Sequence, residues 1–239
     1  MLQAAQKNVM PGPEEMESLS IAVKNHMFGL DGPTQTRIGP RTQKQIYFGK
    51  LFYGFMEIFE CLEALEDIAF MAQRFPFPET RISPDRYLRF LVEAHYGEIY
   101  ILRGRLEQYL TMIERQFKGD QRHQSIRSGC TKLTNLLRDA LDGVLRIRHH
   151  HVHLERFSDV GIDRLKSIGL IATNARGKVG RLMKTYYRIE YASVRSNWLK
   201  TMRKNNKELR KLLDAVTKPL FTVVFDKETL AFNCPAGFV

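Results

Sequence analysis

Apolar side chains recur at helical spacing in three long stretches of this chain. In residues 43–74 the stripe is Ile46, Leu51, Phe55, Ile58, Leu62, Leu65 and Ile68. Between residue 84 and about residue 117 it is Leu88, Leu91, His95, Ile99, Leu102, Leu106, Leu110 and Ile113. From about residue 122 to residue 155 it is Ile126, Cys130, Leu133, Leu137, Ala140 and Val144. Each pattern predicts a long helix that buries one face against its neighbours.

Proline, glycine and short polar side chains mark the expected ends of these helices. The run Phe75-Pro76-Phe77-Pro78 ends the first one, because proline disfavours a helical conformation in the residue before it. Ser83 followed by Pro84 is typical of an N-cap with proline at the first helical position. Lys118-Gly119-Asp120 separates the second helix from the third.

Two more helices are expected in the second half of the chain. Ser158 is predicted to cap a short helix that reaches Ile168, and Asn174 to cap a fourth long helix that reaches about Val216. The adjacent residues Asn205-Asn206 are a possible break in that helix, because asparagine is a poor helix former.

The pattern therefore predicts an all-α fold, a bundle of four long helices plus short helices. Residues 1–42 contain four prolines and little periodicity, and we expect them to form an extended N-terminal arm. The helical bundle is assigned to residues 43–217 and a C-terminal tail to residues 218–239. The tail begins with the β-prone run 221–225, which has no obvious strand to pair with.

Charge points to a polyanionic partner. The formal net charge is +11 and the sequence pI is about 9.7. Between residues 175 and 218 there are 13 Lys and Arg against Glu190, Glu208 and Asp214, so the net charge of this segment is 13 − 3 = +10. Such a surface attracts nucleic acid first and an anionic membrane second.

The fourth helix carries the candidate phosphate-binding side chains: Arg181, Lys184, Arg188, Arg195, Lys200, Arg203 and Lys204. The alternative is that they form a solvated cationic surface. A membrane role is disfavoured, because the helix has too many polar positions for a clear apolar face outside the bundle. Its aromatic residues, Tyr186, Tyr187, Tyr191 and Trp198, can stack on bases, but we expect at least half of them to belong to the core.

The remaining composition favours a cytoplasmic protein. Only three cysteines occur, Cys61, Cys130 and Cys234, and no pair has the short spacing of a zinc or redox motif. No apolar run approaches the roughly 20 residues that span a membrane, and no secretory leader is recognisable. We therefore expect no membrane-spanning segment.

One short motif carries chemistry. The pattern of arginine, then Asn, Asp or His, then three residues and a histidine occurs only at residues 148–153, which read Arg-His-His-His-Val-His. Imidazole exchanges a proton near neutral pH, and guanidinium holds a phosphate bidentately as negative charge builds on it. This pair of functions is what cleavage of RNA through its 2′-hydroxyl requires.

The motif resembles the signature of the HEPN superfamily (higher eukaryotes and prokaryotes nucleotide-binding domains), and residues 43–217 are similar to it in their helical architecture. Many of its members are metal-independent ribonucleases of toxin–antitoxin, abortive-infection and RNA-targeting CRISPR systems. The resemblance implies that Arg148 and His153 are the catalytic pair and that His149 is the polar second position. HEPN toxins paired with nucleotidyltransferases often have a tyrosine two residues past the last histidine, where this chain has Glu155. It therefore resembles another branch.

Helix geometry separates the two catalytic candidates. Residues five apart on a regular helix point about 140° away from each other, so Arg148 and His153 do not converge without a distortion or a second copy. HEPN enzymes commonly bring two motifs to one cleft by dimerising, and we expect a homodimer with the C-terminal half of the third helix near its two-fold axis.

Other interpretations of these histidines stay open. A histidine run is often a solvated face, and His149 with His153 has metal-ligand spacing on a helix. His95 is expected to be a hydrogen-bonded core residue. The preferred hypothesis is a metal-independent RNA endonuclease of HEPN type without a cofactor, serving as a toxin or phage-defence effector with a possible antitoxin or regulator. The alternative is a non-catalytic helical RNA-binding or adaptor protein that uses the basic fourth helix.

Overall fold

The computed structural model describes residues 42–74, 82–153, 157–224 and Pro235, apart from the side chains of Lys44, Leu145 and residues 148–153. In these residues the chain forms five helices and no strand: α3 (Gln43–Arg74), α4 (Pro84–Gln116), α5 (His123–His153), α6 (Val160–Asn174) and α7 (Gly177–Val224). Over this described part of the chain the predicted all-α fold is confirmed, with four long helices and one of the expected short helices. The expected N-terminal arm and most of the expected tail lie outside the described residues.

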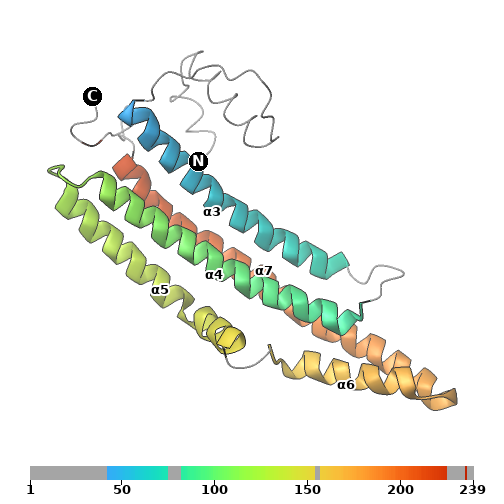
Figure 1. The fold of residues 1–239 in the computed structure, drawn as a ribbon. Helices are drawn as coiled ribbons and strands as arrows, with labels where there is room; N and C mark the ends of the chain where they lie inside the picture. Colours follow the sequence, from blue (N-terminus) through green and yellow to red (C-terminus); the bar gives the residue numbers. More distant parts are fainter. Residues whose placement is uncertain (1–41, 75–81, 154–156, 225–234, 236–239) are drawn as a thin grey trace, which may run out of the picture.

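The helices form an elongated bundle (Figure 1). α4 packs against α3 on one side and α5 on the other, and α7 runs along the length of the molecule in contact with all of the other helices. α6 packs on the first part of α7, and this α6–α7 hairpin projects past the start of α4. No helix in the described part of the chain is long and apolar enough to cross a membrane.

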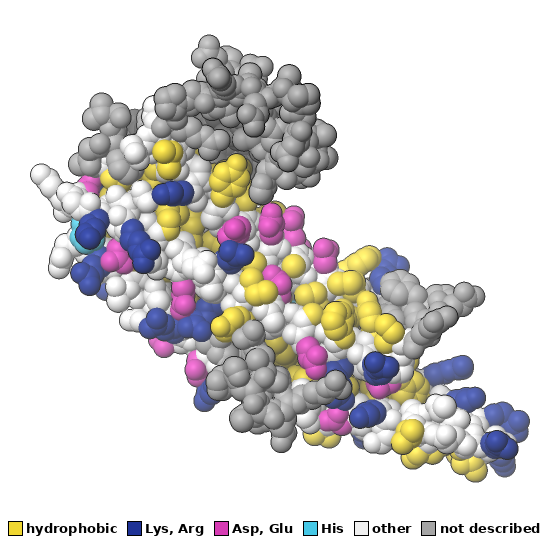
Figure 2. Space-filling model, viewed as in Figure 1, with side chains coloured by type: hydrophobic (Ala, Val, Ile, Leu, Met, Phe, Trp, Pro, Cys, Tyr) yellow, Lys and Arg dark blue, Asp and Glu magenta, His cyan; other side chains and the backbone are white. Residues whose placement is uncertain are grey.

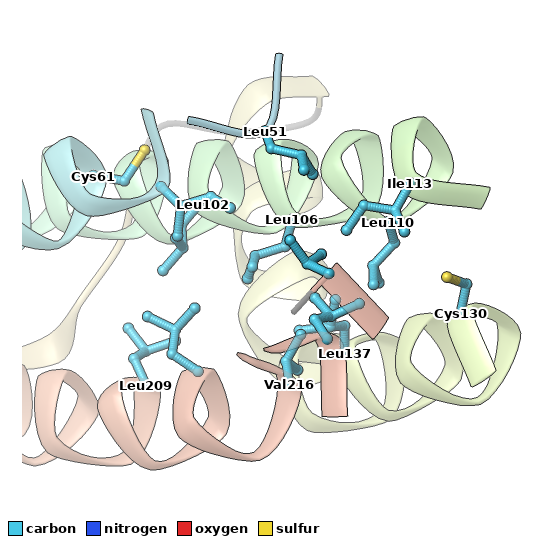
Figure 3. Packing of buried hydrophobic residues seen from close by; sticks show 14 of the residues in the cluster. Leu51, Cys61, Leu102, Leu106, Leu110, Ile113, Cys130, Leu137, Leu209 and Val216 are labelled. Carbon is cyan, nitrogen blue, oxygen red and sulfur yellow. The ribbon is translucent and has the colours of Figure 1, made fainter. Parts of the chain in front are cut away.

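One hydrophobic core fills the half of the bundle that contains α5 (Figure 3). It joins the first two thirds of α3, the second half of α4, α5 and the end of α7. Its largest fully buried members include Tyr47, Leu106, Leu110 and Phe117. At this level α3 and α4 approach closely, since a Cβ atom on Gly54 would lie only 2.6 Å from the ring of Tyr109. Glycine therefore sets the spacing of these two helices.

A second core lies under the α6–α7 hairpin. It combines the end of α3 and the start of α4 with Phe157, α6 and the first half of α7, and its buried members include Leu88, Leu91, Ile162 and Leu165. Because α7 contributes to both cores, one rigid helix fixes the position of the hairpin relative to the rest of the bundle.

Two hydrogen bonds connect α3, α4 and α7 in the interior, where the two cores meet. His95 of α4 is only 2% exposed, and its Nε2 lies 3.0 Å from Oδ1 of Asn206 on α7. The Asn206 amide nitrogen donates to the carbonyl oxygen of Leu65 on α3 at 3.0 Å. That carbonyl can only accept, so Asn206 presents its own oxygen to His95, and Nε2 must carry a proton. The prediction of a hydrogen-bonded core histidine is confirmed. The expected break at Asn205–Asn206 is wrong, because α7 is unbroken there and the half-buried Asn206 amide is hydrogen-bonded through both its oxygen and its nitrogen.

The helix ends differ from the predicted ones at α6 and α7. Asp159, rather than Ser158, caps α6, and its Oδ1 accepts from the backbone N–H of Ile162 at 2.9 Å. Asn174 is the last residue of α6 instead of the cap of α7. α7 begins at Gly177, whose φ of +63° is in the left-handed region that favours glycine.

α7 also continues past the expected end near Val216, through Pro219 to Val224. Leu220 and Val224 are both buried in the first core and continue the apolar stripe of the helix. Burial of this face outweighs the β-propensity of residues 221–224 and the backbone hydrogen bond that Pro219 cannot donate.

The buried, hydrogen-bonded His95 lets us predict how the stability of the fold depends on pH. Burial lowers the pKa of His95, so the folded protein keeps this ring neutral while the unfolded chain binds a proton near the ordinary value of about 6.5. The free energy of unfolding should therefore fall as the pH drops below about 6.5. At about pH 7, His95→Leu should destabilise the fold by about 1–3 kcal/mol, because the oxygen of the half-buried Asn206 side chain loses its partner.

Urea unfolding followed by circular dichroism, at about pH 7 and about pH 5, measures both effects. The stability gap between wild type and His95→Leu should narrow at the lower pH, since only the wild type loses the contribution of a neutral histidine. A gap that is constant or widens on acidification contradicts this account.

Candidate nucleic-acid interface

The histidine motif occupies the last turns of α5, which is helical up to His153. The side chains of Arg148, His149 and His153 lie outside the described residues. Their mutual approach, and the alternative metal pairing of His149 with His153, therefore stay predictions.

Phe157, the first described residue after the motif, is fixed to the bundle. Phe157, four residues beyond His153, is buried, and its ring centroid lies 5.8 Å from that of Trp198 and 6.1 Å from that of Tyr96. Arg89 of α4 donates from Nη1 to the Phe157 carbonyl oxygen at 2.8 Å. Since a chain advances by at most about 3.6 Å per residue, the Cα atom of His153 lies within about 14 Å of that of Phe157.

Arg89 also connects this segment to α6. Its other terminal nitrogen forms an ion pair with Asp163, whose second oxygen accepts from the Ser158 hydroxyl at 2.7 Å. The Ser158 hydrogen bond, followed by the hydrogen bond and charge of Arg89, lowers the pKa of Asp163. The carboxylate therefore stays ionised and holds α4, the segment at Ser158 and α6 together.

The predicted cationic side chains of α7 do not share one face. At about 100° per residue, Arg181, Lys184 and Arg188 fall within about 60° of one another, and all three are exposed. Lys200 and Lys204, also exposed, fall about 120° or more round the helix from Arg188. These two therefore cannot contact a strand that follows the first three.

The two other predicted arginines of α7 have partners inside the protein. Arg195 is half-buried, with its guanidinium carbon 5.6 Å from the centroid of the Tyr191 ring. Arg203 donates to the side-chain oxygen of Gln73 on α3 at 2.7 Å. The seven candidate phosphate-binding side chains of α7 therefore do not form one continuous surface. Of these side chains, Arg181, Lys184 and Arg188 form a group that is exposed to solvent on one side of the helix.

Lys184 and Arg188 line a cleft of about 920 Å³ between the start of α4, α6 and α7. Arg86 of α4 and Lys166 of α6, which are also exposed, complete a set of four cations around it. The complete lining is Ser83, Pro84, Asp85, Arg86, Asp163, Lys166, Ser167, Gly169, Leu170, Ala172, Thr173, Lys184, Tyr187, Arg188 and Tyr191. Lys and Arg side chains gather over this end of the molecule (Figure 2).

The two acidic residues of the cleft are already engaged. Asp163 is paired with Arg89, and buried Asp85 accepts a hydrogen bond from the Tyr187 hydroxyl at 2.9 Å. Their charges are therefore partly satisfied from within the protein, whereas the four cations are exposed. The cleft can bind an anion of extended shape, such as a phosphodiester backbone.

Tyr187 and Tyr191, which line the cleft, mainly stabilise the packing of the helices around it. The rings of Tyr187 and Tyr191 lie nearly parallel, with centroids 6.4 Å apart and an interplanar angle of 13°. Burial raises the pKa of Tyr191 to about 12, and burial together with the hydrogen bond to Asp85 raises the pKa of Tyr187. Both are neutral at physiological pH. Tyr187, Tyr191 and Trp198 pack in the second core, in agreement with the expectation for at least half of the aromatic set.

Sequence reasoning missed Arg86 and Lys166. Each belongs to a helix outside the basic segment, and only the packing of α4 and α6 on α7 brings them to Lys184 and Arg188. No local sequence signal marks such a pairing.

Among the described residues, no group of three His, Cys, Asp or Glu side chains is arranged to hold a metal ion. Comparison of the chain with known family models, curated proteins and solved structures finds no match.

If RNA binds in the cleft, charge reversal on the cleft face of α7 should weaken RNA binding more than charge reversal on another face of the same helix. Lys184→Glu/Arg188→Glu should weaken binding of a labelled single-stranded RNA and reduce the salt slope of log affinity by about 1.4, because each phosphate that the protein no longer neutralises lowers the slope by about 0.7. Fluorescence anisotropy at several salt concentrations measures this.

The matched control is Lys200→Glu/Lys204→Glu, which changes the net charge equally at exposed positions of the same helix. It should retain most of the wild-type affinity. Equal losses of affinity in the two double variants would mean that RNA responds to the overall charge and that the cleft has no special role.

Proposed function

We propose that this protein is a metal-independent RNA endonuclease of the HEPN type, which holds single-stranded RNA in the cleft between α4, α6 and α7. Arg148, His149 and His153 carry the chemistry. The single observation that supports the proposal most is the link through Arg89. This side chain binds both Phe157, just past the motif, and Asp163 in the cleft wall. A strand in the cleft therefore lies beside the helices to which the end of the motif is anchored.

The proposed reaction uses only groups of the protein and the substrate. The imidazole of His153 takes the proton of a ribose 2′-hydroxyl, and the 2′-oxygen attacks the adjacent phosphorus. The bond from phosphorus to the 5′-oxygen breaks, and this oxygen leaves as a hydroxyl with the proton that His153 took from the 2′-hydroxyl, which returns the imidazole to its neutral form. Arg148 stabilises the charge that builds on the phosphate oxygens, and His149 contributes a polar contact. The products are a 2′,3′-cyclic phosphate and a 5′-hydroxyl.

A homodimer is part of the proposal. The C-terminal half of α5 has an exposed stripe of apolar and small residues at intervals of four, three and four: Leu136, Ala140, Gly143 and Ile147. This stripe lies outside the core and ends directly before Arg148. Such spacing suits packing against another helix, and a two-fold axis offers the same stripe twice. Self-association along α5 would bring a second copy of the motif helix alongside the first.

The biological setting follows from the resemblance alone. An RNA endonuclease of this class would act in the cytoplasm as a toxin or phage-defence effector, under the control of an antitoxin or regulator. The second candidate function, non-catalytic RNA binding, needs only the cleft. The four cations of the cleft come from α4, α6 and α7, and none belongs to the α5 motif.

Cleavage should survive chelation and depend on the motif. Purified protein incubated with total RNA in EDTA should produce fragments with 2′,3′-cyclic phosphate or 3′-phosphate ends, and His153→Ala or Arg148→Ala should abolish them. Electrophoresis and end-group analysis measure both. Products with 3′-hydroxyl ends, or activity that requires a divalent metal, contradict the proposed chemistry. RNA binding without any cleavage favours the second candidate.

The dimer prediction has its own variant. A Cβ atom on Gly143 meets nothing within 4 Å, so Gly143→Glu should leave the monomer folded while placing a charge in the proposed interface. Sedimentation at micromolar concentration should show a dimer for wild type and a monomer for this variant, with loss of cleavage. Asn135→Glu, at an exposed position of α5 outside the stripe, should keep the dimer. A wild-type monomer that still cleaves RNA refutes this interface.

A further inference from the structure

The α6–α7 hairpin has an exposed apolar face that the RNA cleft does not use. On α7 it consists of side chains at intervals of three, four and three: Val179, Leu182, Tyr186 and Ile189. Leu182 is 66% exposed and Ile189 is 64% exposed. The expectation that this helix lacks an apolar face outside the bundle is therefore wrong. Its core contacts use only the side that contains Gly180, Tyr191 and Val194.

The same face extends over α6. Val160 is 86% exposed and Ile171 is 49% exposed. Arg164, which shares their side of α6, hydrogen-bonds the Tyr186 hydroxyl and forms an ion pair with Glu190 at 3.3 Å. These bonds tie the two helices together along the edge of the apolar face. Apolar side chains from both helices thus form one surface instead of two separate stripes.

The charge of the hairpin limits what can cover this surface. Residues 160–190 contain seven Lys and Arg and only two acidic residues, Asp163 and Glu190, so the net charge is 7 − 2 = +5. Both acidic side chains are already paired within the protein, with Arg89 and Arg164. A second hairpin of the same kind would add five more positive charges and no free carboxylate. The occupant that fits is apolar and anionic.

The shape of the hairpin narrows the choice further. α6 and the first part of α7 form the projecting end of the molecule, so part of the hairpin extends beyond the other helices (Figure 1). None of the exposed side chains of this apolar face lines the cleft of about 920 Å³. A partner helix that docks in a hydrophobic groove would not find one in this cleft, because these side chains do not line it. An apolar face with cations beside it is instead typical of helices that lie in the headgroup region of a bilayer.

We infer that the α6–α7 hairpin binds the surface of a membrane containing anionic lipids. Val179, Leu182 and Ile189 enter the boundary between headgroups and acyl chains, and the neighbouring Arg176 and Lys178 contact the headgroups. The hairpin lies on the bilayer and does not cross it. This inference does not rest on the proposed ribonuclease activity, because none of the side chains placed against the bilayer belongs to the α5 motif or lines the cleft.

Co-sedimentation with phosphatidylcholine vesicles, with and without phosphatidylserine, tests the inference. Wild type should bind only the vesicles that contain phosphatidylserine. Leu182→Ser/Ile189→Ser should reduce this binding at least about tenfold, because each large aliphatic side chain that leaves water contributes about a factor of ten. Arg176→Glu/Lys178→Glu should reduce it as well and remove most of its salt dependence.

The control variant is Phe90→Ser, which removes a 61% exposed apolar side chain from α4. It should bind vesicles like wild type. All of these substitutions are at exposed positions, so the helical circular dichroism signal should be unchanged. RNA affinity of Leu182→Ser/Ile189→Ser should also equal that of wild type, which keeps this test separate from the cleft.

Three outcomes overturn the inference. The first is that wild type ignores vesicles containing phosphatidylserine. The second is that it binds them equally well after the apolar replacements, since charge alone then accounts for the binding. The third is that sedimentation in the absence of lipid shows self-association that Leu182→Ser/Ile189→Ser abolishes, which would make a second copy the occupant of this face.

Discussion

The amide of Asn206 is the contact on which the geometry of the bundle depends. It donates to the Leu65 carbonyl of α3 and accepts from His95 of α4, so one side chain of α7 fixes three helices at one level. Apolar stripes alone tolerate a slide of one helix along another, because many aliphatic contacts are nearly equivalent. A half-buried amide with two hydrogen-bonded partners does not, since a shift would leave polar atoms without partners at a cost of about 1–3 kcal/mol each.

The position of α7 along α3 and α4, which the Asn206 hydrogen bonds fix, determines where the cleft lies. α7 is unbroken from Gly177 to Val224, so its register at Asn206 also fixes the height of Lys184 and Arg188 relative to α4. The bond from Tyr187 to Asp85, at the first turn of α4, fixes the rotation of α7 at the cleft itself. The four cations are thus positioned by buried contacts on rigid helices, which reduces the ordering needed to meet a phosphate backbone.

The helices could be predicted from the sequence because their apolar period is clear over thirty or so residues. Asp159 was missed as the cap of α6 because Ser158 and Asp159 are adjacent and both suit that position; in the structure Ser158 bonds to Asp163 instead. Arg86 and Lys166 could not be found, because their place in the cleft depends on how separate helices pack. The apolar face of the hairpin was also missed, since a sequence stripe does not reveal whether a partner helix covers it.

The first part of α7 shows why charge and apolar character can serve different purposes on one helix. Its buried side contains Tyr191 and Val194, its cationic side Arg188 and its exposed apolar side Ile189. With 3.6 residues per turn, the centre of the apolar side lies about 130° from that of the buried side and about 150° from that of the cationic side. Contact on one exposed side therefore does not obstruct the other. A hairpin lying on an anionic bilayer would keep its cleft open to solvent, so RNA and lipid could be bound at the same time and would compete only through long-range charge, which salt screens over about 10 Å.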